Sequence, residues 1–203
     1  MPLGGFVAVK KSSASKTSAA KKAAVAKKPP ARQRNAGVTA AKPSASHGPV
    51  LTVGDKAPLF SLQTQDGQSL ALKDFIGKQN VVLYFYPRAM TPGCTAQACG
   101  LRDSARALRQ YKTVALGVSP DKVSALAKFR ERDGLNFDLL SDVDKSTAKQ
   151  YGAWGLKKFM GREFMGVLRR TFIIGKDGRI KHIMEKVNTQ THHDDVLAFL
   201  STL

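Results

Sequence analysis

The chain has 203 residues, of which 42% are hydrophobic and 24% are charged. This length is sufficient for one domain with a substantial core. Its 33 Lys and Arg against 15 Asp and Glu give a formal net charge of +18. No run of about 18 apolar residues exists, which excludes an apolar membrane-spanning helix. Two cysteines are too few for a disulfide framework and fit a reducing compartment, so we expect a cytoplasmic protein.

The first 49 residues differ in composition from the rest of the chain. They contain ten Lys or Arg and no Asp or Glu, so they carry +10 of the net charge and residues 50–203 carry +8. Unbalanced charge and few large apolar side chains cannot build a core, so residues 1–49 are predicted to be a disordered basic tail. The Ala-Lys stretch at residues 18–28 could become helical against an anionic partner, and Pro29 would end that helix.

Three roles for this tail remain open. It has the character of an arm that binds a polyanion, and nucleic acid is the most abundant candidate. Such binding would use phosphate contacts without base reading, because Phe6 is the only aromatic residue of the segment. Transit peptides are also basic, Ser-rich and poor in acidic residues. A tail that only increases solubility is the third possibility.

Residues 50–203 are predicted to form one domain in which strands and helices alternate. The expected elements are a hairpin at 60–63 and 69–72, a strand at 81–86, a helix at 94–111, a strand at 113–118, helices at 122–132 and 144–151, a hairpin at 170–174 and 179–184, and a helix at 191–200. This order predicts an α/β sandwich with a mixed sheet and helices on both faces. Trp154 and Phe159 are expected to pack a loop.

The two cysteines, Cys94 and Cys99, follow the apolar run at residues 81–86. A buried strand that leads into Thr91-Pro92-Gly93 would deliver Cys94 to the first turn of a helix. Unpaired backbone N–H groups and the helix dipole favour a thiolate there. This placement indicates a redox enzyme.

The five-residue step between the cysteines constrains their chemistry. On an ideal helix, Cα atoms five residues apart are about 8.6 Å from each other, whereas disulfides rarely tolerate more than about 7 Å. The helix must therefore open before the sulfurs can join. The spacing suits a cycle in which Cys94 is oxidised and Cys99 then reacts with it. From the spacing alone, two inert half-buried thiols remain an equal alternative.

The pattern Pro87-x-x-x-Thr91-x-x-Cys94 resembles the active-site signature of the peroxiredoxins. A second cysteine five positions later is similar to the bacterioferritin comigratory protein, or Q-type, subfamily. Further stretches similar to bacterial members follow in the same order, at residues 54–58, 97–103, 139–142, 154–155, 159–161 and 169–174. The resemblance covers roughly residues 50–203 and implies a thioredoxin-like fold with an N-terminal β-hairpin. Because it is closer to bacterial than to plant members, it favours a nucleic-acid-binding arm, and with it nucleoid association, over a transit peptide.

The resemblance also implies roles for five residues. Cys94 would be the peroxidatic nucleophile and Cys99 the resolving thiol, and the two would form an intramolecular disulfide. Negative charge develops on the departing peroxide oxygen, so the site needs donors. Thr91 would supply its hydroxyl and Cys94 its backbone N–H, while Arg169 would favour the thiolate and orient the substrate. Pro87 would shield the pocket from water.

Arg169 has a neighbour, Arg170, that could take the same role. Adjacent residues of a strand point to opposite faces, so only one of them can reach Cys94. Alignment of Thr171-Phe172 with the family pattern selects Arg169 and leaves Arg170 as a solvated charge. Thr91 also has an alternative role, as a turn or helix-capping residue.

The leading function is a thiol peroxidase that reduces hydrogen peroxide and organic hydroperoxides and is recycled by thioredoxin or a similar thiol reductant, without a cofactor. The resemblance permits a monomer or weak dimer, and the sequence does not decide the oligomeric state. A protein dithiol-disulfide oxidoreductase is the first alternative, disfavoured because Thr91 and Arg169 would lack a purpose. A polyanion-binding protein with an inert domain is the second. Metal binding by His192 and His193 is not expected, since adjacent helical residues diverge by about 100°.

Overall fold

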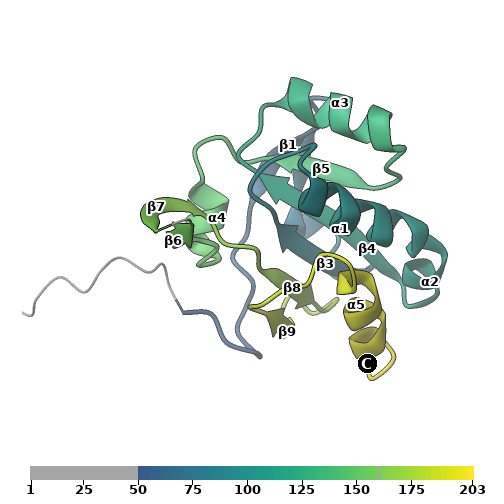
Figure 1. Cartoon of the computed structure of the whole chain (residues 1–203). Coiled ribbons are helices and arrows are strands. Elements are labelled where there is room, and N and C mark those ends of the chain that lie inside the picture. Colours follow the sequence, from purple (N-terminus) through teal and green to yellow (C-terminus); the bar gives the residue numbers. More distant parts are fainter. Residues whose placement is uncertain (1–49, 160) are drawn as a thin grey trace, which may run out of the picture. The chain divides into compact units, whose positions relative to one another are not determined.

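The computed structural model describes residues 50–159 and 161–203, and the predicted tail at residues 1–49 lies outside them. Within the described residues, seven strands form one sheet in the order β2-β1-β5-β4-β3-β8-β9 (Figure 1). These strands are β1 (Ser61–Thr64), β2 (Ser69–Ala71), β3 (Asn80–Phe85), β4 (Thr113–Ser119), β5 (Asp138–Ser141), β8 (Thr171–Ile174) and β9 (Ile180–Met184). The helices are α1 (Pro92–Asp103), α2 (Ala105–Gln110), α3 (Val123–Asp133), α4 (Ser146–Gln150), α5 (His192–Leu200) and the short 3₁₀ helix η1 (Leu72–Asp74).

The sheet is mixed, as the sequence predicted. Strands β3, β4 and β5 are parallel, whereas β8 pairs antiparallel with β3, β9 antiparallel with β8, and β1 antiparallel with both β2 and β5. The crossovers between the parallel strands contain α1, α2 and α3, as parallel pairing requires. The two predicted hairpins are the β1–β2 and β8–β9 pairs.

Strand β3 lies in the middle of the core and is buried on both faces. Alternate residues of a strand point to opposite faces, and here they enter two separate apolar clusters. Val81, Leu83 and Phe85 pack with residues of α4 and the segment before β1, whereas Val82, Tyr84 and Tyr86 pack under α1, α3 and α5. The predicted helices on both faces are therefore confirmed.

The predicted single helix at residues 94–111 is wrong at both its start and its middle. Helix α1 begins at Pro92, since proline has no N–H to lose at the first helical position. Ser104 then separates α1 from α2, with a ψ of 2°. Serine competes for the backbone through its own hydroxyl and favours helix ends. The bend lets α2 turn along β4.

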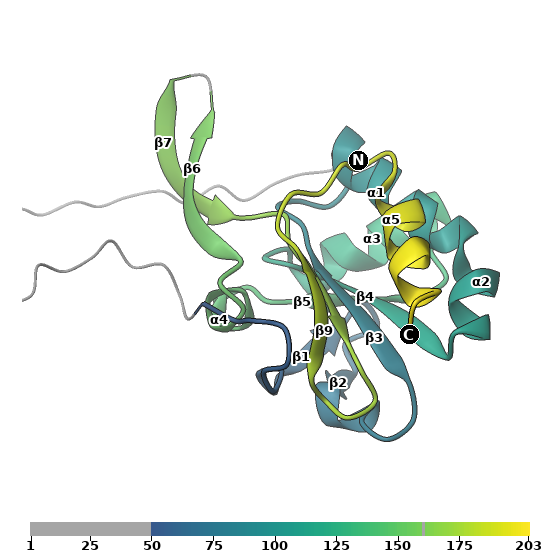
Figure 2. The ribbon, with the colours of Figure 1, turned by 90° about the horizontal axis from the view of Figure 1, so that it is seen from below.

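Two features of the fold were not predicted. Strand β5 was not expected as a strand, although it pairs in parallel with β4. The segment around Trp154 is not a loop but a hairpin of β6 (Trp154–Phe159) and β7 (Arg162–Val167), which extends away from the central sheet in Figure 2. Trp154 is half-buried against the core, whereas the prediction for the Phe159 side chain lies outside the described residues.

The described residues contain no helix of the length and apolarity that a bilayer crossing needs.

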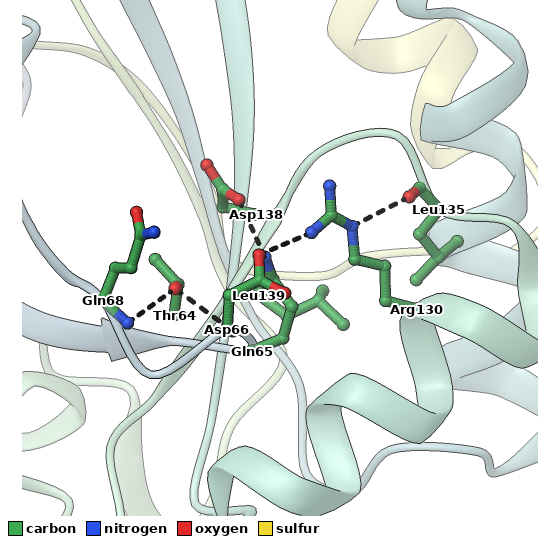
Figure 3. A network of polar contacts seen from close by, with 8 residues as sticks. All are labelled: Thr64, Gln65, Asp66, Gln68, Arg130, Leu135, Asp138 and Leu139. Atoms are coloured by element: carbon green, nitrogen blue, oxygen red, sulfur yellow. Dashed lines mark hydrogen bonds and ion pairs between the residues drawn. The ribbon is translucent and has the colours of Figure 1, made fainter.

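The buried side chain of Gln65 joins the β1–β2 turn to strand β5 (Figure 3). Gln65, only 2% exposed, accepts a hydrogen bond from the Leu139 N–H at 2.8 Å and donates to Asp138 and Asp66. Arg130 of α3 donates to the same Asp66 carboxylate at 2.7 Å. Gln65 thus joins the β1–β2 turn to β5, and Asp66 joins the same turn to α3.

We expect Gln65→Ala to lower the free energy of unfolding by about 2 kcal/mol, because it leaves the buried Leu139 N–H unpaired. Urea unfolding followed by circular dichroism measures this. Gln68→Ala is the matched control, since the Gln68 side chain is exposed and only its backbone N–H joins the network. Equal losses for both variants would contradict this account of the network.

Candidate active site

The start of α1 presents Cys94 at the end of the central strand. After β3, the chain turns through Met90, which has a φ of 61°, and Thr91 occupies the N-cap of α1. Cys94 is the third helical residue and is 1% exposed. Its backbone N–H belongs to the first turn, where helix geometry provides no intrahelical acceptor. The sulfur is therefore buried in the first turn of α1, the position in which the sequence places Cys94.

Arg169 reaches the sulfur from the segment before β8. Its Nη2 donates to Cys94 Sγ at 3.3 Å, across 75 residues of sequence. The neighbouring Arg170 instead lies 3.5 Å from the exposed carboxylate of Glu185. Of the two arginines, the structure thus brings Arg169 to the thiol, where it places a donor and a positive charge.

Thr91 and Pro87 lie on the turn that leads into α1, and both are half-buried. The Thr91 hydroxyl donates to the Arg88 carbonyl at 3.1 Å and makes no capping bond to the helix. The structure therefore gives Thr91 the N-cap position without the capping hydrogen bond. Its hydroxyl is held by a turn contact.

Cys99 lies in the same helix as Cys94, and both are free thiols. Cys99 is half-buried, and ideal helix geometry puts the two Cα atoms about 8.6 Å apart. That exceeds the span of a disulfide, about 7 Å at most. In this state of α1 the two sulfurs cannot join.

Three polar residues that sequence reasoning missed complete the site. Arg169 Nη1 donates to Oε1 of Gln97. Gln97 Nε2 lies 3.2 Å from His192 Nδ1, and His192 Nε2 lies 2.9 Å from Thr171 Oγ1. Gln97 and His192 are each 1% exposed and Thr171 is fully buried. A glutamine three residues after Cys94, on the same face of the helix, was the available signal.

Tyr84 of β3 and Tyr86, which follows that strand, pack in the same buried cluster as Cys94 and form the apolar floor beneath it. The rings of Tyr84 and Tyr86 stack with centroids 5.5 Å apart, and both hydroxyls are buried without a hydrogen-bond partner among the described residues. Burial raises the pKa of both phenols. They therefore remain neutral and add no negative charge beside the sulfur.

Lys157 of β6 brings the projecting hairpin close to the site. Its Nζ donates to the Val167 carbonyl at 3.0 Å. Burial first, and then the charge of Arg169, lower the pKa of Lys157, while Cys94 acts in the opposite direction. The β6–β7 hairpin thus adds a second basic side chain within electrostatic reach of the thiol.

His192 and His193, which were not expected to share a metal ion, have different contacts in the structure. His192 is turned inward to Gln97 and Thr171, whereas His193 lies 3.5 Å from Asp194. In the described part of the chain, no three His, Cys, Asp or Glu side chains are grouped as metal ligands would be.

Residues 53–183 match the model of the AhpC/TSA family. The peroxiredoxin Bcp of Escherichia coli is 50% identical over 150 residues, which cover 74% of this chain and 96% of that protein. The crystal structure of the peroxidoxin BcpB from Mycobacterium tuberculosis superposes with a TM-score of 0.68 at 34% identity, covering 76% of this chain and 99% of that one. A Xanthomonas campestris bacterioferritin comigratory protein, whose structure is described together with its alkyl peroxide reduction activity, gives a TM-score of 0.67 at 29% identity, covering 70% of this chain and 90% of that one.

The fold and the matches define an enzyme of the peroxide-reducing class with a thioredoxin-like fold. The chain belongs to the AhpC/TSA family and is a peroxiredoxin of the Bcp, or Q, type. It is thus a thiol peroxidase, and members of this class use a peroxide and a thiol reductant such as thioredoxin.

The buried histidine gives a prediction about stability. Burial first, and then the charges of Arg169 and His193, lower the pKa of His192 from 6.5 to about 4. The unfolded chain therefore binds a proton at His192 at a higher pH than the folded chain does. This contribution to stability is complete above about pH 6.5 and is lost as the pH falls towards about 4, with a full size of about 3 kcal/mol.

We expect His192→Asn to remove this part of the acid slope. Denaturant unfolding of both proteins between about pH 7 and pH 4.5 gives the two stability curves, and the difference between them isolates the histidine. The other titratable groups near His192, namely Arg169, His193 and Tyr84, are common to both proteins. Parallel curves would show that His192 titrates alike in the folded and unfolded chains.

Proposed function

We propose that Cys94 is the nucleophile with which this peroxiredoxin reduces hydrogen peroxide and organic hydroperoxides. The contact between Arg169 Nη2 and Cys94 Sγ, 3.3 Å, at the start of α1 carries this proposal. The thiolate attacks one peroxide oxygen, an S–O bond forms and the O–O bond breaks. The departing oxygen takes the electron pair and a proton and leaves as water or alcohol, and Cys94 becomes a sulfenic acid.

The donors around Cys94 are suited to the charge that develops in this step. Arg169 donates toward the sulfur, and the Cys94 backbone N–H lies in the first turn of α1, where helix geometry gives it no intrahelical acceptor. The Thr91 hydroxyl would turn from the Arg88 carbonyl to the peroxide. Pro87, half-buried beside Tyr86, would keep water from the pocket. Fixed donors in a dry site stabilise a developing anion more than solvent does.

The second step would use Cys99. Its thiolate attacks the Cys94 sulfenic sulfur, an S–S bond forms, and the S–O bond breaks with loss of water. Because α1 holds the two residues too far apart, the helix must open first. A thioredoxin-like dithiol then reduces the disulfide by exchange and restores both thiols. No step requires a cofactor.

The basic tail would give the enzyme a second partner. Residues 1–49 carry +10 of the +18 net charge, which suits electrostatic contact with nucleic-acid phosphates. We propose that the protein is cytoplasmic and that this arm associates it with the nucleoid. We also propose that it is a monomer or a weak dimer.

Replacement of either cysteine tests the catalytic cycle. Cys94→Ser should abolish peroxide turnover, because no thiolate remains at the start of α1. Cys99→Ser should consume one equivalent of peroxide per chain and stop at the sulfenic acid. Stopped-flow fluorescence and intact-mass spectrometry measure these outcomes, with loss of two hydrogens per chain expected for the wild type. Turnover by Cys94→Ser would refute the assignment.

Charge removal in the tail tests the arm. In a plot of the logarithm of the DNA-binding constant against the logarithm of the salt concentration, each phosphate contact contributes about 0.9 to the steepness of the slope. We therefore expect the slope to become shallower by about three to four when four tail lysines are replaced by Gln. The tail set is Lys21, Lys22, Lys27 and Lys28, and the control set of exposed domain lysines is Lys73, Lys128, Lys149 and Lys186. Gel-shift titration across salt concentrations gives the slopes. If both sets lower the slope equally, the arm has no special role.

A further inference from the structure

We propose that Gln97 and His192 are positioning residues that hold Arg169 against Cys94 only while α1 is intact. This inference rests on the proposed role of Cys94 as the nucleophile. It assigns a function to a buried polar chain that the peroxide chemistry itself leaves unused. The chain runs from Arg169 through Gln97 and His192 to Thr171.

The direction of every hydrogen bond in this chain follows from its first member. A guanidinium only donates, so the Gln97 atom facing Arg169 must be the carbonyl oxygen. The amide nitrogen therefore faces His192 and donates to Nδ1. An imidazole that accepts at Nδ1 must carry its proton on Nε2, which then donates to Thr171 Oγ1. Only the neutral Nε2–H form of His192 satisfies both neighbours.

The same reasoning shows what a different imidazole would do to the arginine. With a proton on Nδ1, His192 would face the amide donor of Gln97 with a second donor. Rotation of the amide would relieve that conflict, but it would turn the NH₂ group toward the guanidinium. Arg169 would then lose an acceptor, and its guanidinium group would no longer be held in the orientation that faces Cys94. The state of His192 thereby controls the arginine through one intervening side chain.

The far end of the chain is anchored by elements that need not move when α1 opens. Thr171 lies on β8 and pairs with Tyr84 of the central strand. His192 is the first residue of α5 and is 1% exposed. Gln97, by contrast, lies between the two cysteines on α1. Opening of that segment would withdraw Gln97 from both Arg169 and His192, so the arginine is fixed in the reduced helical state and released in the disulfide state.

If the network had only a structural role, its loss would lower stability and leave the rate of Cys94 oxidation unchanged. The test therefore measures stability and rate separately. His192→Gln keeps a group that can reach toward Thr171 but removes the acceptor at the Nδ1 position. His192→Asn places an amide oxygen near the Nδ1 position and can still accept from Gln97. We expect His192→Gln to lower the second-order rate constant of Cys94 oxidation by hydrogen peroxide by about tenfold, and His192→Asn to restore most of it.

Stopped-flow oxidation of the full-length chain measures these rates, and unfolding midpoints report stability separately. A normal rate for folded His192→Gln would overturn the inference. Loss of rate in both variants without rescue by His192→Asn would overturn it as well. Failure of the proposed function looks different, because Cys94→Ser would then keep its peroxide reaction and wild-type Cys94 would stay a thiol.

Nitrogen NMR of the wild-type histidines keeps the proposal testable if a variant does not fold. In the reduced enzyme we expect His192 to show an accepting Nδ1 and a protonated Nε2. After one equivalent of peroxide, the Nδ1 resonance should shift, because Gln97 no longer donates to it. A protonated Nδ1 in the reduced enzyme, or an unchanged resonance after the disulfide has formed, would refute the proposal.

Discussion

The contact between the Arg169 guanidinium and the Cys94 sulfur is the interaction on which the site depends. A positive charge in a partly buried position is costly unless it is paired and hydrogen-bonded. Here one guanidinium nitrogen donates a hydrogen bond to the Cys94 sulfur, and the other terminal nitrogen donates to the Gln97 carbonyl oxygen. The arginine thus has a hydrogen-bond partner for two of its nitrogens, and the thiol has a positively charged donor beside it. The apolar tyrosines below the site exclude water, which strengthens that pairing.

The arrangement also imposes a conflict that the helix must resolve. Helix α1 has to be intact to hold Cys94 and Gln97 near Arg169, yet it has to open for Cys99 to reach Cys94. Two polar contacts join it to α3: Arg132 donates to the Thr95 hydroxyl at 3.0 Å, and Arg102 donates to the Asp133 carbonyl. Thr95 lies between the two cysteines, in the segment that would open under the proposed cycle, whereas Arg102 lies beyond Cys99. The first contact can therefore break while the second keeps the end of α1 attached.

Much of this architecture was accessible from the sequence because its signals are local. The run at residues 81–86 predicted a buried strand, and the turns at Asp66-Gly67 and Asp177-Gly178 predicted both hairpins. Strand β5 and the β6–β7 hairpin lack an equally clear pattern, since Lys157 and Lys158 interrupt the apolar residues of β6. Serine favours helix ends but does not require one, so the break at Ser104 also depends on how α2 packs along β4, which the local sequence does not supply.

The polar network around Arg169 shows why a site is harder to predict than a strand. Cys94 and Arg169 could be identified because their residue types match the family pattern. Gln97 and His192 are recognised as site residues only from their contact with each other in the folded chain. In sequence they are 95 residues apart, and alone each resembles an ordinary polar residue of a helix. Burial removes water as a partner, so most buried donors pair with a protein acceptor, as Gln97 does with His192. That pairing links the orientation of one amide to the protonation of one imidazole, and through them the arginine to the C-terminal helix.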